Sequence, residues 1–391
     1  IENIQAYIKN KPGDIDATSQ LIRIQKNRVV QSQLNRNWTQ ALTRQQQLIR
    51  LQKNTDNFKQ WADINRKIKP AEQQLVNYQN LLWQYPNNQW LIGDAIAAFS
   101  QQGRYTAAVK MLPRLQSKFA ASYVLEHAAY STRQVQRPEQ ALNLYTTGAQ
   151  RFPKNIQFHL GRALSLLDQN KSTAASLILE SLSEKNPNDL GIRSALAACY
   201  AAQGKTMQEL LQYQAILQYA PDNADAYRKS TLLTLEMGST ETAFNFASLQ
   251  PTYFSKQDWK RLYSDRAAIA IRWANLYEPK VTLNIARIAT AELYLQELKD
   301  YLGKHFPSDY RAQFNADNDY LLMLSLRQEH AAVIKQYKKL KASSFDMPPA
   351  SQRIAAKAYL ALQQPRESLK ILNTLSEINN EVLSQKYYAY L

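Results

Sequence analysis

The chain has 391 residues, a formal net charge of +16 and only 9 glycines. Its length exceeds that of one ordinary compact domain, and no segment alternates apolar and polar residues long enough to favour a strand over a helix. The single cysteine, Cys199, excludes an internal disulfide framework and a multi-cysteine metal site. Cys199 lies among small residues of a predicted helix, so we expect a buried thiol with a structural role.

Residues 1–85 are rich in helix formers and carry apolar side chains at helical spacing around Trp38 and Trp61. We predict that this segment is helical, with a degenerate copy of the repeat that follows as one interpretation. Residues 1–121 carry 17 Lys or Arg against 7 Asp or Glu, interleaved with glutamine over 22–38. A solvated helix face explains this pattern, and contact with an anionic polymer or membrane surface stays open. No nucleic-acid motif occurs, so we expect no nucleic-acid partner.

Three prolines, Pro153, Pro187 and Pro221, stand 34 residues apart. Each closes an apolar, helix-patterned run and is followed within two residues by Asn or Asp. This is the period and punctuation of the tetratricopeptide repeat (TPR), a pair of helices that stacks on its neighbours. The register predicts a TPR array over 86–254, with units that begin near residues 89, 122, 156, 190 and 224.

Residues that were not used to set the register agree with it. The turn between the two helices of a unit falls on Asn170, Gly204 and Gly238, which tolerate a positive φ. Small residues recur where helices must approach closely, with Thr231 and Glu209 as exceptions. They are Ala129, Ala163 and Ala197 on first helices, and Ala141, Ala175 and Ala243 on second helices.

Beyond the array, residues 255–306 are helical by pattern but fit no unit, which predicts an irregular helical pair. Residues 307–391 read again as TPR-like repeats. The predicted fold class is therefore all-α: a TPR superhelical solenoid with irregular helical pairs at its ends. No stretch has the roughly 18 uncharged apolar residues of a membrane helix, and Ile1 does not open a signal segment. We expect a soluble segment, either cytosolic or the mature piece of an exported protein.

Catalytic chemistry is disfavoured by the residues present. The sequence contains no glycine-rich phosphate loop and no GxSxG nucleophile elbow. No histidine has a second ligand at a metal-binding spacing; the four are His127, His159, His305 and His330. We therefore expect no enzyme activity, no cofactor and no metal.

The best binding surface is the concave side, which the first helix of each unit lines. Its predicted stripe combines aromatic rings with carboxylates, and residues 122–255 carry 11 Lys or Arg against 11 Asp or Glu. Rings stack on pyranose faces and carboxylates pair with ammonium groups, so this surface suits a sugar polymer that carries amines. Packing between units is the alternative role for the same aromatic residues. The candidate polymer-binding residues are Trp90, Asp94, Tyr123, Glu126, Tyr130, Asp168, Asp225, Tyr227 and Glu236.

The carboxy-terminal part resembles a known family. The features that carry the resemblance are Val333-Ile334, Tyr337, Leu340-Lys341, Pro348-Pro349, Ala358-Tyr359-Leu360, Gln364-Pro365 and Ile371-Leu372, together with the order of the central repeats. In these features residues 86–391 are similar to the periplasmic TPR region of the outer-membrane porin that exports poly-β-1,6-N-acetyl-D-glucosamine (PNAG) in biofilm-forming Gram-negative bacteria.

The resemblance implies a periplasmic location as part of an outer-membrane protein, with a β-barrel in the same full-length protein. It also implies two partners: PNAG made cationic by partial deacetylation, and the periplasmic deacetylase that removes the acetyl groups. The repeats would guide the polymer by many weak contacts. The alternative function is a generic TPR adaptor that binds a peptide or a folded protein.

Overall fold

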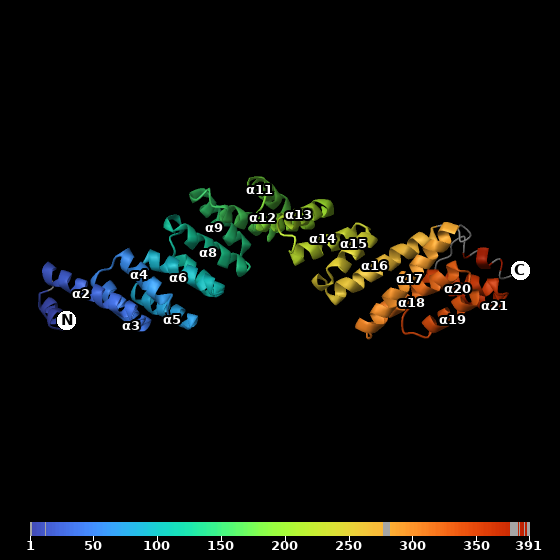
Figure 1. Ribbon diagram of the computed structural model, residues 1–391, viewed down its shortest axis with the longest axis horizontal. Coiled ribbons are helices and arrows are strands. Elements are labelled where there is room, and N and C mark those ends of the chain that lie inside the picture. Colours follow the sequence, from blue (N-terminus) through green and yellow to red (C-terminus); the bar gives the residue numbers. More distant parts are fainter. Residues whose placement is uncertain are drawn as a thin grey trace. The chain divides into compact units, whose positions relative to one another are not determined.

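The computed structural model describes residues 2–11, 13–276 and 282–375, together with 382, 384–386 and 388. Every regular element in this described part is a helix, and no strand occurs in it (Figure 1). The chain divides into two compact units, residues 1–205 and 206–391. The boundary falls inside the predicted repeat that begins at residue 190. The division into four segments that the sequence suggested stays a prediction.

The first unit is a row of helices in which most helices pack against the next along the chain (Figure 1). Two short 3₁₀ helices, η1 (Leu112–Arg114) and η2 (Ser117–Phe119), follow α7. The α-helices are α1 (Glu2–Asn10), α2 (Ile15–Leu34), α3 (Trp38–Leu51), α4 (Thr55–Asn65), α5 (Ala71–Gln84), α6 (Gln89–Gln101), α7 (Tyr105–Met111), α8 (Ser122–Gln134), α9 (Pro138–Arg151), α10 (Ile156–Leu167), α11 (Ser172–Lys185) and α12 (Leu190–Ala202).

The second unit continues with helical pairs, two of whose members are unusually long. The helices are α13 (Thr206–Tyr219), α14 (Ala224–Glu236), α15 (Thr240–Leu249), η3 (Pro251–Tyr253), α16 (Lys256–Asn275), α17 (Thr282–His305), α18 (Tyr310–Leu326), α19 (His330–Lys341), α20 (Pro349–Ala361) and α21 (Pro365–Leu372). The 20-residue α16 and the 24-residue α17 stand where the sequence predicted an irregular pair.

The residues after each repeat proline cap the first helix of the next unit. The side chains of Asn155, Asp189 and Asn223 accept hydrogen bonds from the backbone N–H groups of Gln157, Ile192 and Ala226. These bonds satisfy N–H groups that have no partner inside the helix. The Asn and Asp residues that follow the repeat prolines in the sequence are therefore helix N-caps.

The turn between the two helices of a repeat uses a left-handed residue. Asn170, Gly204 and Gly238 have φ of 60°, 68° and 85°, as the sequence predicted. Five more residues share this conformation: Gly103 and Gln136 within the predicted array, and Arg36, Gln328 and Gln363 outside it. Arg36 joins α2 to α3, so residues 1–85 contain at least one helical pair with the turn of a repeat.

Small residues let the helices approach closely. The predicted alanines are all buried, with none of their surface exposed: Ala129, Ala141, Ala163, Ala175, Ala197 and Ala243. Gly148 and Gly161 act in the same way, because a Cβ at either would lie 2.2 Å from the ring of Phe158 or Tyr145. Cys199 is fully buried, as expected, and burial raises the pKa of its thiol to about 11.

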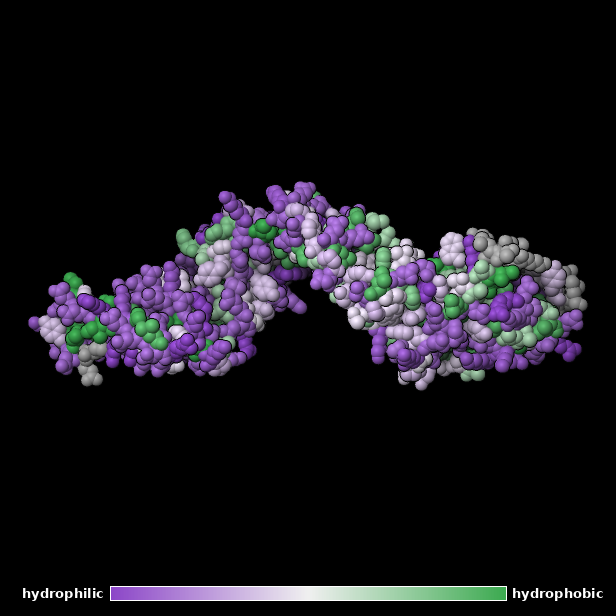
Figure 2. Space-filling model, viewed as in Figure 1, coloured by the Kyte–Doolittle hydropathy of each residue, from purple (hydrophilic) through white to green (hydrophobic). Residues whose placement is uncertain are grey.

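Residues 29–85 share one hydrophobic core with the first regular repeats. This core runs without a break from Val29 to Ala128. Trp61 and Tyr78 meet edge to face at its centre, with ring centroids 5.0 Å apart. The amino-terminal segment is thus packed onto the array. Outside such cores the face seen in Figure 2 is mostly hydrophilic, with apolar side chains in small groups.

Candidate functional site

The first helices of the repeats line a cavity of about 500 Å³ in the first unit. Trp90, Asp94 and Tyr123 from the predicted stripe border it. Sequence reasoning missed the lining residues that belong to or adjoin α4 and α5, where no repeat register could be set: Lys59, Asp63, Arg66 and Gln74. Gln101 and Gln102, at the end of α6, complete the polar lining. The lining therefore offers two aromatic rings, three amides and two pairs of opposite charges.

Asp94 has a structural role at this cavity. It is buried, and its carboxylate accepts hydrogen bonds from the hydroxyls of Tyr78 at 2.5 Å and Tyr123 at 3.2 Å. The guanidinium of Arg66 lies 3.5 Å away. Burial and then the charge of Asp94 raise the pKa of both tyrosines, so both stay protonated and keep donating. Asp94 thus fixes Tyr123 in place, and its carboxylate is not free for an ammonium group.

Glu126 is the stripe carboxylate that has no ion pair in the described part of the chain. Its Oε1 accepts hydrogen bonds from the Ser122 hydroxyl at 3.1 Å and from the Asn155 amide. Among the described residues, no lysine or arginine lies within ion-pair distance of it, and its side chain is half-buried. Tyr130, one turn further along α8, is exposed and meets Tyr105 edge to face with centroids 5.7 Å apart. This face of α8 therefore presents a carboxylate beside an accessible ring.

The remaining predicted carboxylates are paired within the chain. In the first unit Asp168 accepts two hydrogen bonds from Arg133, at 2.5 Å and 3.2 Å. In the second unit the side chains of Asp225 and Glu236 form ion pairs with Lys229 at 2.8 Å and Arg261 at 2.9 Å.

Tyr227 has a packing role, which the sequence had left open for the aromatic residues. Its hydroxyl donates to the backbone carbonyl of Phe246 at 3.0 Å, and its ring packs against Tyr253. Asp225, Tyr227 and Glu236 all belong to the second unit, whereas the predicted residues of α6 and α8 belong to the first.

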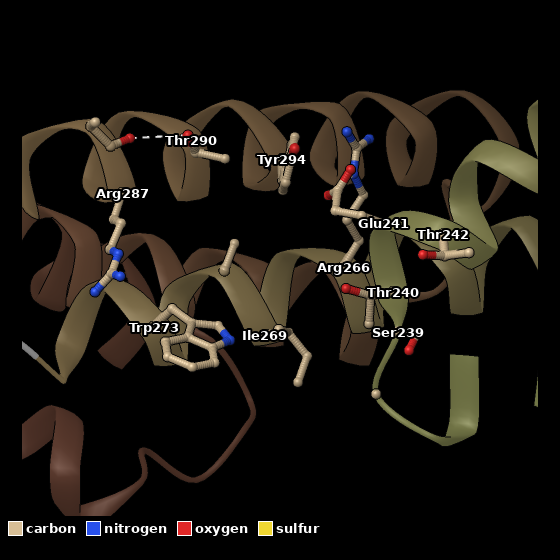
Figure 3. Close-up of a pocket in the computed structure, with 13 residues that line it drawn as sticks. Ser239, Thr240, Glu241, Thr242, Arg266, Ile269, Trp273, Arg287, Thr290 and Tyr294 are labelled. Carbon is tan, nitrogen blue, oxygen red and sulfur yellow. Dashed lines mark hydrogen bonds and ion pairs between the residues drawn. The ribbon is translucent and has the colours of Figure 1, made fainter. Parts of the chain in front are cut away.

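A second cavity, of about 480 Å³, lies between α15, α16 and α17 (Figure 3). Trp273 and Ile269 of α16 face Thr290 and Tyr294 of α17 across it, and the pair Glu241–Arg266 stands at one end (Figure 3). Sequence reasoning missed this cavity because the long helices fit no repeat unit. The only available signal was a tryptophan within a helix that also carries arginines.

No helix in the described part of the chain is both long enough and apolar enough to cross a membrane. The same residues contain no group of three or more His, Cys, Asp and Glu side chains that could hold a metal ion.

Comparisons with known proteins identify the repeat family that this chain resembles. A model of the tetratricopeptide repeat family matches residues 133–199. The chain is 25% identical over 320 residues to the poly-beta-1,6-N-acetyl-D-glucosamine export proteins of Escherichia coli K12 and O157:H7. That match covers 78% of this chain and 37% of each relative, so the chain spans little more than a third of those proteins. The matches confirm the resemblance to the TPR region of such a protein and the all-α TPR solenoid fold.

Solved structures similar to this chain include further repeat proteins. One is a tetratricopeptide repeat protein from Parabacteroides merdae, at 12% identity and a TM-score of 0.37 over 69% of this chain and 99% of that one. Another is YrrB, described as a TPR protein with an unusual peptide-binding site, at 16% identity and a TM-score of 0.36 over 44% of this chain and 92% of that one.

Proposed function

We propose that the protein is a non-enzymatic periplasmic scaffold that binds and guides partly deacetylated PNAG during its export. The observation that carries the proposal is the similarity over 320 residues to PNAG export proteins. The cavity at Trp90 supports it. Aromatic rings and amides of the kind that line this cavity are suited to the apolar faces and the hydroxyl groups of sugar rings.

Glu126 is the contact that we assign to the free amines of the polymer. An ammonium group could approach this carboxylate without breaking an ion pair of the chain, since Glu126 has only neutral donors. Asp168 and Glu236 would each have to give up an arginine first. A single half-exposed ion pair contributes about 1 kcal/mol or less, which suits a polymer that must move.

The test is a titration of the whole chain with β-1,6-linked oligosaccharides of one length, either fully acetylated or partly deacetylated. We expect both to bind. Trp90→Ala should weaken both, while Trp90→Phe, which keeps a ring in the cavity, should weaken them less. Glu126→Gln should cost about two- to fivefold with the partly deacetylated chain only. Failure of both oligosaccharides to bind would count decisively against polymer guidance.

Docking of the deacetylase is the second part of the proposal. We assign it to the basic amino-terminal third, where residues 1–121 carry a surplus of 10 positive charges, 17 against 7. Association through such a surface should weaken steeply as salt rises. A salt-independent affinity for the deacetylase would refute this assignment.

The competing function is a TPR adaptor that binds a peptide or a folded partner in the groove, which the family match over residues 133–199 favours. A pull-down that recovers a protein bound to the repeats, and from which added oligosaccharide does not displace that protein, would support the adaptor function over polymer guidance.

A further inference from the structure

We infer that the cavity between α15, α16 and α17 binds a neutral, N-acetylated sugar residue and excludes its deacetylated counterpart. This inference rests on the proposed function, because it names which residue of a mixed polymer this cavity would take. Its volume of about 480 Å³ is typical of small-molecule sites.

The apolar part of the cavity is unusually accessible. Half of the Trp273 surface is exposed, although this ring lies on a helix whose other face is packed. Ile269 continues the wall formed by Trp273, and Ala286 of α17 lies on the facing wall. Apart from Arg287 near one face, the large Trp273 ring is open to the cavity, whereas an indole in a fold is normally covered by other side chains. The C–H face of a sugar ring, or the methyl of an acetamido group, is an apolar surface of suitable size.

The polar part of the cavity supplies hydrogen bonds without free negative charge. Thr290 donates to the carbonyl of Ala286 at 3.0 Å, which leaves its oxygen able to accept from a sugar hydroxyl. At the opposite end the first turn of α15 lines the cavity, and the Ser239 side chain makes no capping bond to it. Backbone N–H groups of a first turn have no helical partner and suit the carbonyl oxygen of an acetamido group.

Charge is what separates the acetylated from the deacetylated residue. Glu241 is held by Arg266 at 2.8 Å, and Arg266 is shared with Glu297 at 2.9 Å. The guanidinium of Arg266 also stacks 3.5 Å from the centroid of Tyr294, so this cluster is fixed by four side chains. The second cation of the lining, Arg287, lies 5.7 Å from the centroid of Trp273 (Figure 3).

An ammonium group in the cavity would therefore find no unpaired carboxylate, because Glu241 and Glu297 are both engaged by Arg266. It would also lose part of its hydration on entering, with no unpaired carboxylate to compensate for that loss. An acetamido group avoids both penalties and gains the indole contact. Selectivity for the acetylated residue follows from this difference.

The test uses the whole chain and two short β-1,6-linked oligosaccharides of equal length, one fully acetylated and one fully deacetylated. Saturation transfer from protein to the acetyl methyl groups should be strong, and calorimetry should show binding of the acetylated probe. The deacetylated probe should bind at least about tenfold more weakly at this cavity.

Two variants locate the effect. Trp273→Ala removes the ring, and Ala286→Phe fills the cavity while it leaves the ring in place; each should weaken the acetylated probe by about tenfold or more. Leu293→Ala, which removes an exposed apolar side chain of α17 outside the lining, should leave the affinity unchanged. Helix content by circular dichroism checks that each variant is folded.

The outcomes separate this inference from the proposed function. If oligosaccharides bind and Trp90→Ala weakens them, but neither Trp273→Ala nor Ala286→Phe has an effect, the cavity is not a sugar site and polymer guidance stands. If the deacetylated probe binds at Trp273 as well as the acetylated one, the charge argument is wrong. If no oligosaccharide binds, both proposals fail together.

Discussion

Asp319 on α18 provides the sharpest test of the electrostatics. Burial raises the pKa of its carboxyl from an ordinary 3.8 to about 6. It lines a cavity of about 730 Å³ that Arg353, Lys357 and His330 also border. In the described part of the chain it has no hydrogen-bond or ion-pair partner. A carboxylate in this position is desolvated without compensation.

The direction in which stability changes with pH follows from the linkage between proton binding and folding. The folded state holds the proton of Asp319 more tightly than the unfolded chain does, so its contribution to stability is fully present below about pH 4. It is lost as the pH rises through about 6, and the interval from 3.8 to about 6 corresponds to about 3 kcal/mol. Asp319→Asn is neutral at every pH and should escape this loss. Relative to the native protein, the variant should gain about 2–3 kcal/mol between pH 4 and pH 7.5.

Hydrogen exchange of the α18 amides measures this difference directly, because protection reports the free energy of local opening. The ratio of protection factors between the two proteins, taken at each pH, cancels intrinsic exchange and any titration common to both, such as that of His330. We expect the ratio to rise by about 100-fold across the range. A ratio that changes less than about threefold would show that Asp319 is solvated or paired in solution, and the reasoning would be refuted.

Four further substitutions test packing, backbone conformation and charge. Gly161→Ala would place a methyl 2.2 Å from the Tyr145 ring and should lower the free energy of unfolding by about 1–3 kcal/mol; Gly303→Ala, in open space within α17, should raise it by about 0.5–1 kcal/mol in the same urea titrations. Gln136→Gly should raise the melting temperature, because a residue at φ 58° is strained unless it is glycine. Burial alone would raise the pKa of Asp258, yet hydrogen bonds from Arg228 and Ser255 hold it at about 2; Asp258→Asn should therefore destabilise at pH 7, and the cost should shrink as the pH falls from 4 to 2.

The features that the sequence predicted well are local ones. A cap such as Asp189 bonds to an N–H three residues away, and a turn such as that at Gly204 depends on one φ angle. Both require a particular type of residue at a fixed position of the 34-residue period, so both can be recognised in the sequence. The alanines at helix contacts are equally readable, because the same two helices meet in every repeat.

The features that the sequence predicted poorly depend on partners outside the period. Asp94 borders the cavity at Trp90, but its partners Tyr78 and Arg66 lie 16 and 28 residues upstream in a segment without a register, so the sequence did not reveal these contacts. Trp273 and Asp319 sit on helices that fit no unit, so no position number could say which way they face. A register predicts only the contacts that every repeat shares.

The internal pairing of the stripe changes what kind of recognition the groove can support. Each of Asp94, Asp168 and Glu236 meets an arginine from a different helix of the same unit. These ion pairs join neighbouring helices within each unit and leave the carboxylates without free charge. With Glu126 as the stripe carboxylate that has no ion pair in the described residues, the stripe would hold a cationic polymer by ring stacking and hydrogen bonds more than by charge. Contacts of that kind are individually weak and similar at every residue of a repeating polymer. We therefore expect the chain to retain PNAG through many fast contacts, with an affinity that depends little on salt.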